Sequence, residues 1–140
     1  MWLLYAFLSA VAAALVAIFG KLGLKNVDAT LGTTIRSIIM AGFLVLVSLF
    51  LKKFDGFSLQ TISGKDWMWI VLAGIAGAIS WLFYFIALKS GMVTKVVAID
   101  RLSIVFAVVL AALVLGETLG WKTAVGALLM VGGAILISLK

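Results

Sequence analysis

The sequence predicts an all-α integral membrane protein with five transmembrane helices. Hydrophobic residues make up 66% of the 140 residues and charged residues only 11%, whereas an ordinary soluble domain has about 25% charged residues. Apolar runs close to the ~20 residues that cross about 30 Å of hydrocarbon occur five times. Because these runs occupy most of the chain, we expect one membrane domain over residues 1–140 and no separate soluble domain.

The five apolar runs are expected to be helices, because every backbone polar group inside a bilayer needs a partner within the protein. An odd number of spans places the two ends of the chain on opposite sides of the membrane. The predicted helices cover residues 2–20, 31–51, 67–88, 93–115 and 122–139.

Residues at the ends of these runs support their boundaries. Tryptophans favour the membrane interface, and four of the five lie near a predicted helix start: Trp2, Trp67, Trp69 and Trp121. Ser63 followed by Asp66 resembles a capping box that opens the third helix. Gly91 and Gly116 stand where the third and fourth helices are expected to stop.

Several residue types are missing. The chain has no Cys, no Pro and no His. We therefore expect no proline-broken helix, and no cofactor, metal site or enzymatic activity, because the usual nucleophiles, bases and metal ligands are lacking.

The net charge of +6 favours anionic lipid headgroups over nucleic acid as a partner, because the lysines flank apolar runs. Four lysines (52, 53, 65 and 122) fall on the amino-terminal face and five (21, 25, 89, 95 and 140) on the other. Since lysine excess sets membrane orientation, this balance leaves two alternatives open. Either the chain inserts in both orientations, or the spans are slightly misplaced and one orientation dominates.

Three charges lie away from the ends of the predicted spans: Arg36, Asp100 and Arg101. Charges at this depth are costly and by default indicate a functional site. Arg36 and Asp100 could pair between the second and fourth helices, and Arg101 could meet Asp100 of a second copy. Alternatively, the arginines extend to the interface, or Asp100 belongs to a structural ion pair.

Polar and aromatic residues add further candidates for a site. On a continuous fourth helix, Ser103 would share the face of Asp100. On the third helix, Ser80 and Tyr84 lie on one stripe, flanked by Trp81. The two aromatic side chains could stack on an organic cation or a ring. Small-residue stripes of this kind also serve simply for helix packing.

Four segments resemble the EamA-type domain of the drug/metabolite transporter superfamily, in particular its half-size, five-span members from bacteria and archaea. They are KLGLKNVDATLGTTIR at 21–36, WLFYFIALKSG at 81–91, VAIDRLSIVF at 97–106 and LGETLGWKTAVGALLMVGGAILI at 115–137. The resemblance implies one half of an inverted-repeat, ten-helix transporter. It does not extend to the first-helix Glu of small multidrug transporters, or to the fourth-helix Pro of full-length relatives.

From these features we expect a secondary transporter in the cytoplasmic membrane of a prokaryote, working as an antiparallel homodimer. It would export a small polar metabolite with proton coupling, with Asp100 as a proton or substrate site. If all three deep charges face the cavity, two Asp and four Arg give a dimer a net charge of +2, which favours an anion or an amino acid. If the arginines extend away from the cavity, the cavity of the dimer keeps a net charge of −2, which favours an organic cation or drug. The alternative function is a non-transporting subunit, or half of a heteromeric transporter.

Overall fold

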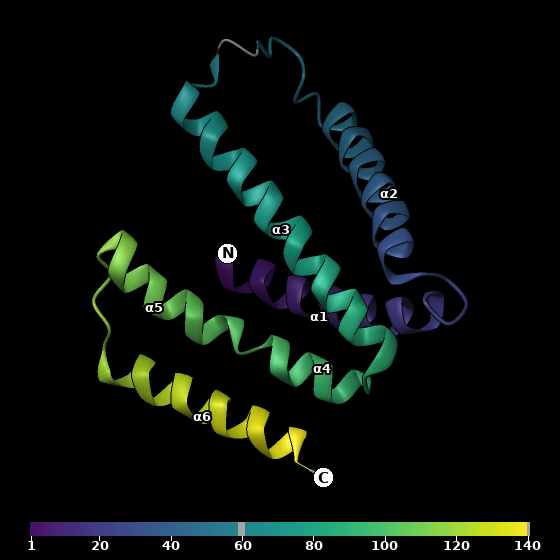
Figure 1. Cartoon of the computed structure of the whole chain (residues 1–140). Coiled ribbons are helices and arrows are strands. Elements are labelled where there is room, and N and C mark those ends of the chain that lie inside the picture. Colours follow the sequence, from purple (N-terminus) through teal and green to yellow (C-terminus); the bar gives the residue numbers. More distant parts are fainter. Residues whose placement is uncertain (59–60, 140) are drawn as a thin grey trace. The chain divides into compact units, whose positions relative to one another are not determined.

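The computed structural model describes residues 1–58 and 61–139, and every regular element in this part of the chain is a helix (Figure 1). Five segments are long and apolar enough to cross a membrane, with Val93–Leu115 counted as one segment. The predicted fold class, all-α with five spans, is therefore confirmed. The helices are α1 (Trp2–Gly23), α2 (Ala29–Phe50), α3 (Gly64–Ser90), α4 (Val93–Asp100), α5 (Ser103–Leu115) and α6 (Trp121–Ser138).

Capping side chains set the starts of α2 and α3 a few residues earlier than predicted. The Asp28 carboxylate accepts hydrogen bonds from the amides of Thr30 and Leu31, at 2.9 and 3.1 Å. Ser63 Oγ accepts one from the Asp66 amide at 3.2 Å and donates to the Asp66 carboxylate at 2.7 Å. These bonds satisfy amide groups that the first turn of a helix leaves without a partner, and the predicted role of Ser63 is confirmed.

The fourth span is not the continuous helix that the sequence predicts, because α4 and α5 are separated at Arg101 and Leu102. Around this break the amides of Leu102, Ile104 and Val105 donate to carbonyls three residues earlier instead of four, which is 3₁₀ geometry. Neither proline nor glycine occurs between residues 93 and 115, so the residues that usually interrupt a helix are lacking.

The glycine predicted to end the fourth span does so. Gly116 has a φ of 70° and its amide bonds back to the Ala111 carbonyl. Glycine adopts this left-handed conformation without steric cost. The third helix ends at Ser90, directly before the predicted stop at Gly91.

The chain divides into two units. The hairpin unit, Leu22–Lys89, contains α2 and almost all of α3. These antiparallel helices are linked by long side chains. At one end of the pair, Lys89 Nζ donates a 2.8 Å hydrogen bond to the Val27 carbonyl, just before α2 begins.

The second unit, Met1–Lys21 with Ser90–Lys140, holds most of α1 together with α4, α5 and α6. Here α4 packs along α6, and the one buried residue of each helix is an alanine, Ala98 and Ala134. Small residues let membrane helices approach closely. Lys95 Nζ also donates to the carbonyls of Ser138 and Leu139, at 3.0 and 3.4 Å.

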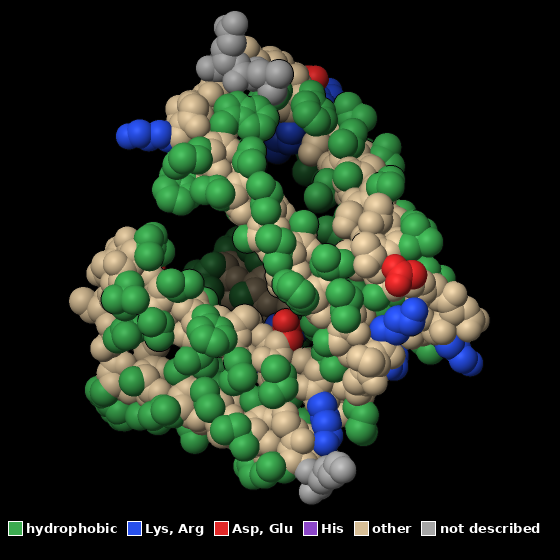
Figure 2. All heavy atoms as spheres, viewed as in Figure 1, with side chains coloured by type: hydrophobic (Ala, Val, Ile, Leu, Met, Phe, Trp, Pro, Cys, Tyr) green, Lys and Arg blue, Asp and Glu red, His purple; other side chains and the backbone are tan. Residues whose placement is uncertain are grey.

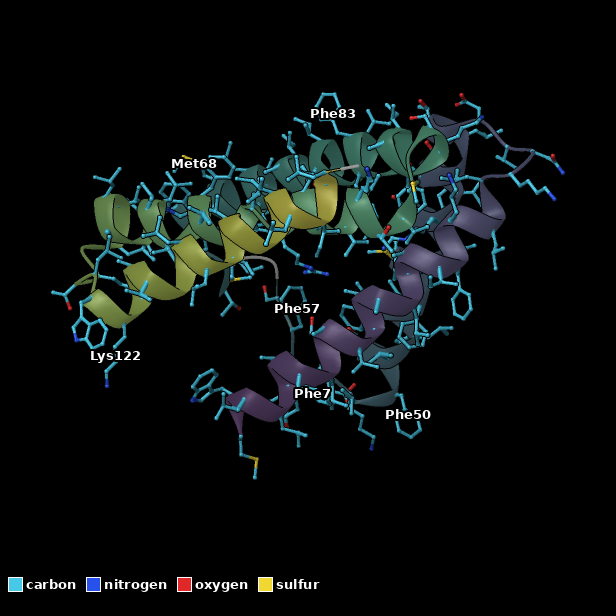
Figure 3. All side chains as sticks on the ribbon, turned by 90° about the horizontal axis from the view of Figure 1, so that it is seen from below. Phe7, Phe50, Phe57, Met68, Phe83 and Lys122 are labelled. Atoms are coloured by element: carbon cyan, nitrogen blue, oxygen red, sulfur yellow. The ribbon has the colours of Figure 1, made fainter. Side chains whose placement is uncertain are left out.

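Large apolar side chains cover the outside of the helices (Figure 2). Phe50 is 88% exposed and Phe83 66% exposed, and both rings point away from their helices (Figure 3). Such a surface would be unfavourable in water and matches hydrocarbon. The protein is therefore a multi-pass membrane protein.

Candidate functional site

The amino-terminal half of α2 carries a run of hydroxyl side chains around Arg36. The Thr33 hydroxyl donates to the Ala29 carbonyl at 2.7 Å, and the Ser37 hydroxyl donates to the Thr33 carbonyl at 2.8 Å. Thr34 makes the same kind of bond to Thr30. These bonds satisfy the hydroxyl groups within the helix, so the charged group of this segment is the Arg36 guanidinium.

Arg36 stacks on aromatic rings of α3. Its guanidinium carbon lies 3.8 Å from the centre of the Trp81 ring and 5.3 Å from that of Phe85. Both distances are within the ~6 Å over which a cation is attracted to a ring face. Arg36 is half-buried, and no hydrogen bond or ion pair holds its guanidinium within the described part of the hairpin unit.

This stack lies well inside the membrane span. Arg36 is the eighth residue of α2 and Trp81 stands nine residues before the end of α3. At 1.5 Å per residue these positions are about 10 Å and about 13 Å from the nearer helix ends. A guanidinium that extended to the interface would lie close to a helix end. The observed conformation instead holds the charge at the level of Trp81.

The rings beneath the guanidinium form a cluster. Trp81 meets Tyr84 edge-on with centroids 5.5 Å apart, and it meets Phe85 at 5.8 Å. Tyr84 and Phe85 are 5.9 Å apart. Phe85 is only 3% exposed, so it anchors the cluster. The predicted site residues Arg36, Trp81 and Tyr84 thus lie together, whereas Ser80 is exposed and outside the cluster.

The other predicted site residues lie at the break between α4 and α5. Asp100 is the last residue of α4 and is half-buried, Arg101 occupies the break, and Ser103 begins α5. The expectation of one continuous helix through Asp100 and Ser103 is wrong, because a 3₁₀ turn lies between them, although residues three apart in such a turn still fall on one side.

The two charges at this break lie between two helix dipoles. A helix carries partial negative charge at its carboxyl end and partial positive charge at its amino end. Asp100 is the last residue of α4, where a negative charge is unfavourable, whereas Arg101 caps the same carboxyl end, where a positive charge is favourable. Arg36 and Asp100 belong to different units, and their pairing stays a prediction.

Sequence reasoning missed the uses of three lysines. Lys21 Nζ donates to the Gly91 carbonyl at 2.9 Å, Lys89 donates to the Val27 carbonyl, and Lys95 donates to the last carbonyls at the end of α6. A lysine near unpaired helix-end carbonyls is the signal that could have indicated such bonds. Phe85 was not among the predicted site residues, and its burial comes from tertiary contacts.

Fold and site together define a polytopic helical membrane protein with charged groups inside its spans. Comparison with known families identifies which class of membrane protein this is. The model of the EamA-like transporter family matches residues 1–139, and the chain therefore belongs to this family. A Sinorhizobium sp protein named "Uncharacterized transporter in cobO 3'region" is 34% identical over 137 residues, covering 98% of this chain and 96% of that protein. No solved structure matches the chain. Family membership confirms a role in membrane transport and implies a transporter, not an enzyme.

Proposed function

We propose that this protein is a proton-coupled secondary transporter that exports a small polar metabolite carrying a carboxylate, as an antiparallel homodimer in the cytoplasmic membrane of a prokaryote. The observation that carries the substrate class is the Arg36 guanidinium stacked on Trp81 within the span. A positive charge at this depth is costly unless something compensates it, and a bound carboxylate would do so.

The stacking geometry suits carboxylate binding. The guanidinium carbon lies 3.8 Å from the centre of the Trp81 ring, and the N–H groups of a guanidinium lie in its plane and point outward. Two of these donors match the two oxygens of a carboxylate. The same stack weighs against an organic cation, because the Trp81 face that could hold one already holds Arg36.

Proton coupling is assigned to Asp100. The chain has five acidic residues. Asp28, Asp55 and Glu117 lie in connecting segments, and Asp66 lies in the first turn of α3. Asp100 is thus the carboxyl group that stands within a span, at an interrupted helix. Transporters commonly place coupling ions at such interruptions near the bilayer midplane.

The homodimer rests on the charge balance and the odd number of spans. Four lysines against five give little orientation preference, and two oppositely inserted copies would supply the two inverted halves that many transporters contain. Of these lysines, Lys140 lies outside the described residues. Single cysteines at Ser58 and Ser90 test this in intact cells. Labelling of both by an impermeant thiol reagent supports dual orientation, and labelling of one contradicts it.

Transport is tested with the purified chain alone in proteoliposomes. We would compare a neutral amino acid, a dicarboxylate and tetraphenylphosphonium under an imposed pH gradient. Arg36→Lys keeps the charge but loses the planar donor pair, so carboxylate flux should fall at least about tenfold, given ~1.5–3 kcal/mol for charged hydrogen bonds. Lys25→Gln removes an exposed charge from the same unit and should leave flux unchanged.

Each outcome bears on one part of the proposal. Preferred movement of tetraphenylphosphonium, or full carboxylate flux in Arg36→Lys, would exclude the carboxylate role of Arg36. Asp100→Asn should abolish the dependence on the pH gradient, and normal coupled flux would remove Asp100 from proton coupling. No flux of any solute by the pure chain would favour the alternative, a subunit that needs a different partner.

A further inference from the structure

The turn that follows α2 is an ordered structure built around two lysines. The Lys52 amide donates to the Leu49 carbonyl at 3.0 Å, and the Lys53 amide donates to the Ser48 carbonyl at 2.9 Å. This pair of bonds is the Schellman motif, which closes a helix end. Two further backbone bonds, between residues 55 and 52 and between 57 and 54, continue the turn to Phe57. We call residues 50–57 the Phe50–Phe57 turn.

Lys52 occupies a conformation that favours glycine. Its φ is 53°, and among the described residues it is the one non-glycine residue with positive φ. A side chain in this region has a steric cost that glycine avoids. At the end of α5 the same kind of position, with φ of 70°, is filled by Gly116. The lysine at the end of α2 is thus present in spite of its backbone, which indicates that its side chain is used.

The turn combines positive charge with exposed aromatic rings. Phe54 and Phe57 are each 48% exposed, and their rings meet edge-on with centroids 6.3 Å apart. Phe50 and Phe57 are visible in Figure 3. Lys52 and Lys53 are exposed, and Asp55 leaves the turn with one net positive charge. Exposed Phe rings at a span end bury themselves at the boundary between headgroups and acyl chains, and nearby ammonium groups attract the headgroup phosphates.

Three lysines near other helix ends differ from this pair. Lys21, Lys89 and Lys95 each donate to a backbone carbonyl of the protein. In the described residues no hydrogen bond or ion pair engages the ammonium groups of Lys52 and Lys53. These two groups remain available to an anion outside the protein, at the height of the headgroups.

We propose that the Phe50–Phe57 turn binds the headgroup of an anionic phospholipid. In this proposal Lys52 and Lys53 bind its phosphate, and the rings of Phe54 and Phe57 contact its glycerol region. This inference is independent of the transported substrate, because it concerns a span end and not the Arg36 stack. It assigns to the double lysine a lipid-binding role that explains why glycine does not end α2.

The test uses the full chain, purified in a neutral detergent and titrated with short-chain phosphatidylglycerol, with short-chain phosphatidylcholine or with inorganic phosphate. The readout is the thermal unfolding midpoint. We expect phosphatidylglycerol to raise the midpoint and the other two ligands to leave it unchanged. Each lysine near an anionic surface contributes roughly five-fold in affinity, so the double variant Lys52→Gly with Lys53→Gln should need roughly thirty-fold more lipid.

The variants separate lipid binding from a purely structural role. Lys52→Gly keeps the left-handed backbone, so without lipid it should unfold at or above the wild-type midpoint. Lys122→Gln removes a lysine at the start of α6, whose side chain points outward (Figure 3), and should keep the full phosphatidylglycerol effect. An unchanged lipid response in the double variant would overturn the proposal. An equal response to inorganic phosphate would overturn the choice of a lipid.

Discussion

The stack of Arg36 on Trp81 can be measured directly by a double-mutant cycle. The variants are Arg36→Met, Trp81→Leu and their combination. The guanidinium lies 3.8 Å from the ring centre, and its side chain is half-buried. Cation–π pairs contribute about 0.5–1 kcal/mol when exposed and about 2 kcal/mol when desolvated. For this geometry we expect a coupling free energy of about 1–1.5 kcal/mol, close to tenfold in the unfolding equilibrium.

The assay is reversible unfolding in mixed micelles with increasing sodium dodecyl sulfate, followed by circular dichroism. Loss of the contacts of Trp81 with Tyr84 and Phe85 occurs in both variants that lack the ring, so it cancels in the cycle. As a control, Lys25→Met combined with Trp81→Leu should be additive. Independent sites add to within about 0.5 kcal/mol. A coupling below that limit for Arg36 would mean that the guanidinium extends to the interface, and the carboxylate argument would lose its basis.

Three further predictions concern the ends and the packing of the helices. A Cβ at Gly32 would lie 2.7 Å from Cδ2 of the buried Leu24, whereas one at Gly42 in the same helix has nothing within 4 Å. Gly32→Ala should therefore lower the free energy of unfolding by about 1 kcal/mol, whereas Gly42→Ala should not lower it. Equal effects of the two substitutions on unfolding in detergent would contradict the packing argument. Hydrogen bonds from the first-turn amides of α2, above all that of Leu31, hold the pKa of Asp28 below its ordinary 3.8. The ionised cap thus stabilises the folded protein above that pH. The stability lost in Asp28→Ala should be largest at neutral pH and should vanish as the pH falls below 3.8. Unfolding midpoints measured across a pH series would check this. Lys95→Met removes two hydrogen bonds to the carbonyls at the end of α6 and should cost about 1 kcal/mol, so an unchanged unfolding free energy would show that these bonds are not stabilising.

The spans could be predicted from sequence because a bilayer enforces them. Twenty apolar residues in hydrocarbon have no alternative to a helix, and the five segments follow from length and composition. Helix starts and stops were predictable where one residue determines them, as at Ser63 and Gly116. The earlier start of α2 follows from the Asp28 cap, and the predicted start at residue 31 missed it.

The interruption of the fourth span could not be predicted, because the usual sequence causes are missing. It contains no glycine or proline, and the polar residues near the break are Asp100, Arg101 and Ser103, none of which is a usual helix breaker. The pairing of Arg36 with rings of α3 likewise depends on how two helices face each other across 45 residues of sequence separation. Local patterns identified the participants, Arg36 and Trp81, as separate candidates only.

The break at Arg101 and Leu102 has a consequence for two oppositely inserted copies. The eight residues of α4 extend about 12 Å and the thirteen of α5 about 20 Å. The break is therefore off-centre, and inversion of one copy would place its break the same distance from the other membrane surface. The two breaks would then lie about 8 Å apart in depth, on either side of the midplane. In such a dimer the two Asp100 carboxyl groups would lie at different depths, one nearer to each membrane surface.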